Sequence, residues 1–316
     1  MPSAPDAAPS TDDLWIDSVR SATDLREAIA MLDAEEITTG VPLVDESERD
    51  RLQRAQHRGA VDAERWHPVV ARRGNQVVGY AAVVAADGPG RSVGDVAPGR
   101  AAGGFSEVLP ALLEHLRRAL PPAADLQIWV RHVDPSDLEA ARDAGAEIER
   151  RLGVLGRDLD TPIEVPPAPD GVTIRASRQP QDDEAVTRVL AGAYAGTGDG
   201  GWDLDRLRAR QRFDWFRPED LLVAEEADGT IDGIHWLKRR SATAGEVYNL
   251  ALHPDGQGRG LGGVLLAAGL QHLRAIGCRE VILWVDLANE RAVRLYAGAG
   301  FTTRWEDVAL HLPPTA

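Results

Sequence analysis

The sequence has little of several features that would define a class of protein. Its 316 residues include one cysteine, Cys278, so no disulfide can form within the chain, and we interpret this residue as a small buried filler. No apolar run approaches the roughly 20 residues of a membrane-spanning helix. Residues 1–13 have no basic start and no apolar centre, so we interpret them as a flexible tail and not as a signal peptide. Together these absences predict a cytoplasmic protein without a membrane partner.

Positive charge is also scarce. The chain has 35 basic and 50 acidic side chains, a net charge of −15, which argues against a nucleic-acid partner because phosphate contacts need clustered Lys and Arg. Lys238 is the only lysine in the sequence. A lysine kept where arginine is otherwise used indicates a site that needs a compact, mobile ammonium, although a solvated surface residue is the alternative. The eight histidines are scattered without metal-ligand spacing, so we expect no metal.

The sequence divides into two halves that share one pattern of predicted elements. Residues 160–170 hold four prolines, which favours an interdomain linker between domains at 14–159 and 171–316. On either side of it a buried-strand pattern, a helix pattern and a glycine recur in the same order. Placing Trp129 on Trp284 puts Gly145 on Gly300 without a gap. We therefore predict tandem copies of one α/β fold, with mixed sheets and helices on their faces.

The second half carries enough periodicity to place its elements. An Asp228-Gly229 turn between two alternating segments predicts a hairpin, and Asn289 is the expected N-cap of a late helix. We expect strands at 172–175, 221–225, 231–238, 246–252, 280–285 and 302–312, and helices at 180–195, 262–276 and 289–299.

A glycine-rich loop follows the predicted strand that ends at Leu252. It includes Gln257-Gly258-Arg259-Gly260-Leu261-Gly262 and leads directly into a helix. Glycines let several backbone N–H groups converge, the helix start adds unpaired donors, and Arg259 adds a positive charge. The loop lacks the Gly-Lys-Ser/Thr ending of a nucleoside-triphosphate loop, so it predicts a pyrophosphate site without phosphoryl transfer.

The loop resembles the Q-x-x-G-x-G/A motif of the GCN5-related N-acetyltransferases, and the downstream spacing of Asn289, Tyr296 and Gly300-Phe301 is similar to that family's pattern. The resemblance implies two tandem domains of this family, each a mixed, mostly antiparallel sheet flanked by helices. It implies acetyl-CoA as the co-substrate. The cofactor contacts that it implies are Leu250, Ala251, Leu252, Gln257, Gly258, Arg259, Gly260, Leu261, Gly262, Gly263, Asn289 and Arg294.

Acetyl transfer to an amine needs a base for the amine, donors for the oxyanion and an acid for the departing thiolate. Glu246, four residues before Leu250 on the predicted strand, is the candidate base; the alternative is an exposed residue at a strand start. Backbone N–H groups near Leu250 would polarise the thioester carbonyl. Tyr296 is the candidate acid, because a phenol with a pKa near ~10 can protonate a thiolate whose thiol has a pKa near ~8.5. Its alternative role is that of a half-buried aromatic residue.

The first half has the outline of the same fold without its loop. Aligning the two halves places Ala101 on Gln257 and Gly104 on Gly260, so the anchoring glutamine is missing. We interpret this half as a lapsed copy that either holds acetyl-CoA weakly or only shapes the substrate groove.

Several strings of the second half, among them Gly200-Gly201-Trp202 and 235–238, resemble the mycothiol synthase family. The resemblance implies acetylation of the cysteinyl amine of a cysteinyl-glucosaminyl-inositol, a small thiol-sugar, to form mycothiol. Two positions depart from the pattern: Asp199 replaces a glutamate and Trp284 replaces a tyrosine. The substrate-binding residues that it implies are Glu46, Asp199, Lys238, Glu246 and Trp284.

Two other functions remain open on the sequence. One is acetylation of another small amine or a protein N-terminus, and the other is a non-catalytic acetyl-CoA sensor. Retention of both Glu246 and Tyr296 argues against the sensor, since binding alone requires neither. The sequence leaves the oligomeric state undecided, with a monomer among the possibilities.

Overall fold

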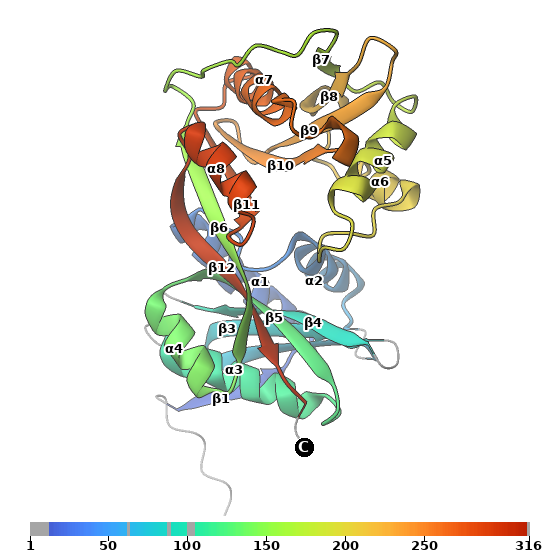
Figure 1. The fold of residues 1–316 in the computed structure, drawn as a ribbon. Helices are drawn as coiled ribbons and strands as arrows, with labels where there is room; N and C mark the ends of the chain where they lie inside the picture. The colour runs from blue at the N-terminus through green and yellow to red at the C-terminus, as the bar shows by residue number, and fades with distance from the viewer. Residues whose placement is uncertain (1–12, 62–63, 87–89, 100–104, 315–316) are drawn as a thin grey trace, which may run out of the picture. The chain divides into compact units, whose positions relative to one another are not determined.

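The computed structural model describes residues 13–61, 64–86, 90–99 and 105–314 (Figure 1). The chain forms two compact units, which are treated separately below. The first comprises Met1–Leu152 together with Trp305–Ala316, and the second comprises Gly153–Arg304. The chain passes from one unit to the other after Leu152 and after Arg304. The proline-rich segment 160–170 therefore lies within the second unit and not between the two units.

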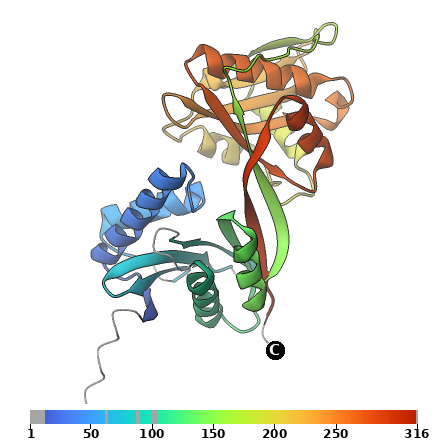
Figure 2. The same ribbon diagram turned by 90° about the vertical axis from the view of Figure 1, so that its left-hand side faces the viewer.

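The first unit is a mixed sheet with helices on both faces. Its strand order is β1-β2-β3-β4-β5-β12, in which β4 and β5 are parallel and the other pairs are antiparallel. Figure 2 shows helices α1 and α2 on one side of this sheet and α3 on the other. The elements are β1 (Leu14–Ser18), α1 (Ala22–Thr39), α2 (Glu46–Arg58), β2 (Trp66–Arg73), β3 (Gln76–Val84), β4 (Arg91–Pro98), α3 (Phe105–Ala119), β5 (Asp125–Val133), α4 (Pro135–Asp143), and parts of β6 (Glu147–Asp158) and β12 (Thr302–Leu312). Residues 153–158 of β6 and 302–304 of β12 belong to the second unit.

Local sequence explains where these helices begin and end. Ser21 and Asp24 form a capping box at the start of α1, and Gly40 ends that helix in the left-handed conformation at φ 72°. Helix α3 places a stripe of leucines, including Leu109, Leu112 and Leu116, into one core of the sheet. The fold therefore follows from capping and helical periodicity.

The last strand of the chain belongs to the first unit. Strand β12 pairs antiparallel with β5, from Glu306 opposite Val133 to Leu312 opposite Leu126. Val308, Leu310 and Leu312 are buried in the same core as the α3 leucines. The sequence placed 302–312 with the second domain, whereas the structure assigns residues from Trp305 onward to the first unit.

The second unit repeats the plan. Its strand order is β6-β11-β10-β9-β8-β7, with β10 and β11 parallel and the pairs from β7 to β10 antiparallel. Helices α7 and α8 lie on one side of the sheet and α5 and α6 on the other (Figure 1). Its elements are β7 (Thr173–Ala176), α5 (Asp183–Ala193), α6 (Leu204–Arg210), η1 (Pro218–Asp220), β8 (Leu221–Glu225), β9 (Ile231–Arg239), β10 (Ala244–Leu252), η2 (Pro254–Gly256), α7 (Leu261–Ala275), β11 (Glu280–Asp286) and α8 (Glu290–Gly298).

The predictions for this half are confirmed closely. Strands 221–225 and 302–312 have the expected bounds, and the other predicted strands and helices differ by a few residues at their ends. The β8–β9 hairpin turns through Gly229 at φ 88°, and Asn289 caps α8 by accepting a hydrogen bond from the Ala292 N–H. Cys278 is buried, as expected of a small filler. Across the described residues, no helix combines the length and hydropathy needed to cross a membrane.

Candidate active site

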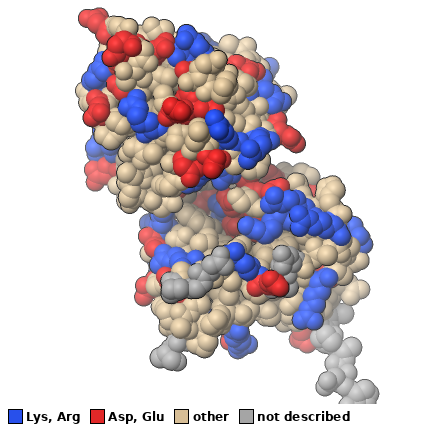
Figure 3. Space-filling model, turned by 90° about the vertical axis from the view of Figure 1, so that its right-hand side faces the viewer, with Lys and Arg blue, Asp and Glu red and all other residues tan. Residues whose placement is uncertain are grey.

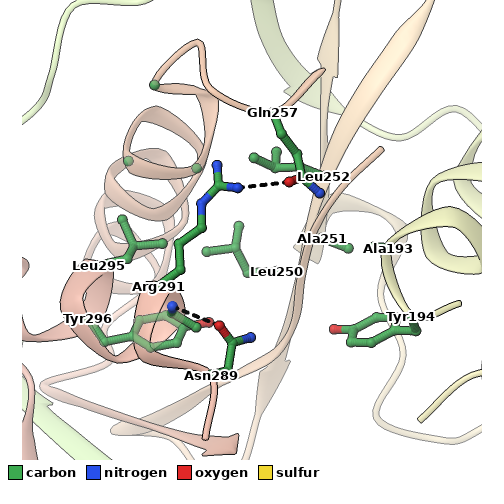
Figure 4. Close-up of a pocket in the computed structure, with 14 residues that line it drawn as sticks. Ala193, Tyr194, Leu250, Ala251, Leu252, Gln257, Asn289, Arg291, Leu295 and Tyr296 are labelled. Carbon is green, nitrogen blue, oxygen red and sulfur yellow. Dashed lines mark hydrogen bonds between the residues drawn. The ribbon is translucent and has the colours of Figure 1, made fainter. Parts of the chain in front are cut away.

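A cavity of about 390 Å³ opens in the second unit between the end of β10, the start of α7 and the start of α8. Figure 4 shows it with Gln257 and Arg291 at one end and Tyr194 and Tyr296 at the other. Its lining residues are Ala193, Tyr194, Leu250, Ala251, Leu252, Gln257, Gly260, Gly262, Gly263, Asn289, Arg291, Ala292, Leu295 and Tyr296.

Strand β10 reaches this cavity because its pairing changes along its length. The parallel register with β11 runs from Ala244 opposite Glu280 to Val247 opposite Leu283, whereas β10 itself continues to Leu252. At the same point the register with β9 shifts between Val247 and Asn249. A bulge of this kind re-aims a strand. Residues 250–252 then border the cavity on the side where β11 has ended its pairing.

The glycine loop presents backbone to the cavity. Gly260 is the N-cap of α7 at φ 83°, and a Cβ built on Gly258 or Gly260 would meet no atom within 4 Å. The first turn of α7 has no acidic residue, so its positive dipole end faces the cavity without a competing carboxylate. The open space beside Gly258 and Gly260 and the backbone N–H groups at a helix start fit a diphosphate group. Leu261, by contrast, points into the core and is fully buried.

Tyr296 lies on the cavity wall, on helix α8. Its ring is buried against Phe301, with ring centroids 5.7 Å apart in an edge-to-face arrangement. Burial raises the pKa of Tyr296 above its ordinary value of 10. The phenol therefore stays protonated at neutral pH and is available as a proton donor.

Tyr194, at the end of α5, is a cavity residue that the sequence analysis missed. Its hydroxyl donates a hydrogen bond to Oδ1 of Asn249 at 3.0 Å. It points toward Tyr296 from the opposite side of the cavity (Figure 4). Burial, with a smaller effect of Tyr296, raises its pKa as well. No motif marks Tyr194, because it follows an ordinary amphipathic helix.

Glu246 lies on β10 before the bulge and does not line the cavity. It is buried, and Nη1 of Arg240 lies 3.1 Å from its Oε2. The Arg240 guanidinium also lies 5.7 Å from the ring centroid of Trp284 on β11. A carboxylate on β10, a guanidinium in the β9–β10 connection and an indole on β11 thus form one cluster.

Lys238 stands directly across from Glu246 in the β9–β10 register. Its Nζ lies 4.8 Å from the ring centroid of Trp215 and 5.8 Å from that of Tyr248. Such distances allow a cation–π interaction, which holds the ammonium over a group of aromatic side chains. That group continues to Trp236, whose ring centroid is 5.3 Å from that of Tyr248.

The cavity is not lined by three other predicted residues of the second unit, Arg259, Arg294 and Asp199. Arg259 pairs with Glu226, and Arg294 pairs with Glu290 on the exposed side of α8. Asp199 is exposed in the segment after α5. Glu46 is in the first turn of α2, in the first unit. Of the predicted cofactor contacts, the cavity brings together Leu250, Ala251, Leu252, Gln257, Gly260, Gly262, Gly263 and Asn289.

In the first unit, the parallel strands β4 and β5, which correspond to β10 and β11, stay paired further along their length. The parallel pairing of β4 with β5 extends from Arg91 opposite Asp125 to Val96 opposite Val130. Such extended pairing fits the interpretation of this half as a lapsed copy. That interpretation stays a prediction, because Ala101 and Gly104 lie outside the described residues.

Comparison with solved structures shows the fold. A GCN5-related N-acetyltransferase from Sphaerobacter thermophilus superposes with a TM-score of 0.70 at 21% identity, covering 98% of each chain. A tandem GNAT protein from the clavulanic acid biosynthesis pathway gives a TM-score of 0.64 at 19% identity, covering 96% of this chain and 99% of that one. The Acetyltransferase (GNAT) family model matches residues 190–301, which include the cavity. The predicted fold, two tandem GCN5-related N-acetyltransferase domains, is confirmed.

Curated relatives narrow the family. A mycothiol acetyltransferase of Frankia alni is 35% identical across 98% of both chains. Those of Saccharopolyspora erythraea and Thermomonospora curvata are 37% and 41% identical, covering 76% and 75% of this chain and 83% and 80% of theirs. The chain belongs to the mycothiol acetyltransferase family. The resemblance noted in the sequence and the prediction of an N-acetyltransferase are both confirmed.

Proposed function

We propose that the chain transfers the acetyl group of acetyl-CoA to the cysteinyl amine of cysteinyl-glucosaminyl-inositol, forming mycothiol. The observation that carries the proposal is the continuity of β10. The same strand carries Glu246, the buried candidate base, and residues 250–252, which border the cavity beside Tyr296. A base and a cofactor site on one strand are suited to direct attack of an amine on a thioester.

The reaction follows from these groups. An α-amine has a pKa near ~8, so it must lose a proton to attack, and the Glu246 carboxylate accepts that proton directly or through a water. The amine nitrogen bonds to the thioester carbon, and backbone N–H groups of β10 stabilise the oxyanion. When the C–S bond breaks, Tyr296 donates its proton to the leaving thiolate, and the phenolate recovers a proton from the nitrogen, which gives up its second proton to become the amide. The raised pKa of Tyr296 keeps the proton in place until that step.

The acceptor site is assigned to the residues around Glu246. Lys238 is opposite that residue in the sheet, Arg240 pairs with it, and Trp284 lies against the Arg240 guanidinium. Ammonium, guanidinium and indole groups suit a sugar with many hydroxyls, because they offer several donors and an apolar face. Asp199 completes the proposed set of acceptor contacts in the second unit, and a contact of the substrate with Glu46 stays a prediction from the family resemblance.

The test is a chromatographic assay of acetylated product with three acceptors: cysteinyl-glucosaminyl-inositol, free cysteine and a peptide that begins with alanine. The thiol-sugar should give the highest kcat/KM. Lys238→Met, which keeps the apolar stem and removes the charge, should raise KM for the thiol-sugar at least roughly tenfold while KM for acetyl-CoA stays within twofold. A higher kcat/KM for the peptide would replace this proposal with a protein N-terminal acetyltransferase.

A further inference from the structure

The glycine loop carries a cation, Arg259, but the charge of this side chain is already paired with acidic residues. Nη1 and Nη2 of Arg259 lie 2.5 and 3.2 Å from the two carboxylate oxygens of Glu226. A second carboxylate, Asp232, is 3.8 Å away. Two acidic groups therefore neutralise this guanidinium on the outside of the loop, and it does not line the cavity. Basic and acidic side chains are mixed in the same way on the face drawn in Figure 3.

Helix α8 offers two arginines in its first two turns, Arg291 and Arg294. The cavity face of this helix includes Ala292, Leu295 and Tyr296. At 100° per residue, with Leu295 at 0°, this face runs from Ala292 at about +60° to Tyr296 at about +100°. Arg291 falls at about −40°, next to Leu295, whereas Arg294 falls at about −100°, on the side away from Tyr296. The structure agrees: Arg291 lines the cavity, and Nη1 of Arg294 pairs with Glu290 Oε2 at 3.0 Å.

Arg291 is the one charged side chain among the described residues that line the cavity. Its Nη1 donates a hydrogen bond to Oε1 of Gln257 at 2.8 Å, across the space between α8 and the loop. Figure 4 shows its guanidinium at the Gln257 end of the cavity, away from the two tyrosines. Within the described residues, no carboxylate forms an ion pair with Arg291, so its charge is available to a ligand.

We propose that Arg291 is the cation that binds the diphosphate of acetyl-CoA, together with the backbone donors at the start of α7. The inference rests on the proposed function, since it concerns the same site. A diphosphate brings about two negative charges to a helix start whose own partial charge is roughly half a unit. The glycine loop contributes shape and N–H donors, and α8 contributes the full positive charge. Arg291 also positions Gln257, through the hydrogen bond between them.

The test compares three arginine variants by calorimetric titration with CoA and with dephospho-CoA, which lacks the 3′-phosphate and keeps the diphosphate. Arg291→Ala should weaken the binding of both ligands by roughly 10- to 100-fold, the value of a lost charge-assisted hydrogen bond. Arg259→Ala and Arg294→Ala are matched controls on the same loop and helix and should change Kd less than about threefold. Arg291→Lys should recover part of the loss, because it keeps the charge without the planar fork.

Steady-state rates give a second readout. Arg291→Ala should raise KM for acetyl-CoA while kcat at saturating acetyl-CoA stays within about twofold, because Arg291 lies away from the tyrosines. An unchanged Kd for Arg291→Ala, or a larger loss for Arg259→Ala, would overturn the inference. A loss confined to CoA would also overturn it, since that outcome assigns Arg291 to the 3′-phosphate. If the wild-type protein binds neither ligand, the proposed function itself fails, which is a separate result.

Discussion

Arg240 and Glu246 form an ion pair at 3.1 Å, and the same guanidinium lies over the ring of Trp284. An arginine of the same hairpin therefore holds the candidate base. Lys238, which is opposite Glu246 on β9, lies instead against the rings of Trp215 and Tyr248. The ion pair fixes the orientation of a buried carboxylate at the point where the acceptor amine is proposed to lie.

Glu246→Gln tests the base. The amide keeps the size and a hydrogen-bond acceptor for Arg240 but cannot take a proton, so kcat should fall by roughly 10²-fold or more. Acetyl-CoA affinity should stay near wild type, because Glu246 does not line the cavity. Steady-state rates check the expected fall in kcat, and calorimetric Kd values check the expected affinity for acetyl-CoA. Full activity in this variant would remove Glu246 from the mechanism.

Tyr296→Phe tests the acid. The change deletes one hydroxyl and keeps the edge-to-face contact with Phe301, so stability should change little, while kcat falls by roughly 10²-fold. Because burial raises the pKa of Tyr296 above 10, its deprotonation should not limit the wild-type rate between pH 6 and 9. Tyr194→Phe is the matched control on the facing wall. An equal loss in both variants would leave the acid unassigned.

Gly260→Val tests the cradle for the diphosphate. A side chain at this position enters the open space beside the helix start, so acetyl-CoA binding should weaken at least roughly tenfold. Gly229→Val is the control, because Gly229 also has a positive φ and open surroundings but lies in the β8–β9 turn. Both variants should lose similar stability, about 1–2 kcal/mol from left-handed backbone. Equal Kd values for the two would contradict the loop assignment.

His235 should make stability depend on pH. The ring is fully buried, its Nδ1 lies 2.7 Å from the carbonyl oxygen of Leu265, and burial lowers its pKa to about 4. The unfolded chain binds the proton near pH 6.5 and the folded chain only near pH 4. Stability from this residue is therefore complete above pH 6.5 and is lost as the pH falls to 4, by up to about 3 kcal/mol.

The measurement for His235 is the free energy of unfolding in urea at pH 7.5 and pH 5, for wild type and His235→Asn. Carboxylates elsewhere titrate in both proteins, so the difference between the two slopes isolates the histidine. The wild type should lose more stability than the variant on going to pH 5. Parallel losses would show that His235 does not titrate in this window.

Leu310→Ala tests the assignment of the last strand. Leu310 is buried in the first unit, so the change should cost about 2–5 kcal/mol there. Hydrogen exchange should rise in peptides from α3 and β5 and stay near wild type in α7 and β11. Leu283→Ala, which opens the core of the second unit, should show the opposite pattern. Faster exchange confined to the second unit in Leu310→Ala would contradict the division of the chain.

The elements and the open glycine loop before α7 were predictable because they depend on local chemistry. The turn at Gly229, the cap at Asn289 and the bounds of β8 follow from backbone preferences and the spacing of apolar residues. The glycine loop was found because glycines before a helix have a direct physical use. These features need no knowledge of distant parts of the chain.

The ion-pair partners of the arginines and the pairing partner of β12 were not predictable in the same way. Arg259 and Arg291 look alike in the sequence, and only the long-range pairing of Arg259 with Glu226 shows that Arg259 is neutralised while Arg291 lines the cavity. The placement of β12 has the same cause, because its partner β5 lies far away in the sequence. Long-range pairing decides both, and a single sequence does not encode it in any local window.

The place of β12 sets an order for folding during synthesis. His311 lies 2.9 Å from Asp125, a residue 186 positions earlier in the chain. Residues 153–304 form one contiguous unit and can collapse as soon as they leave the ribosome. The first unit emerges earlier but waits with one strand position of its sheet open, next to β5, until the last residues are made. The unit synthesised first is therefore expected to finish last, and its open edge is the surface that a chaperone would have to cover in the meantime.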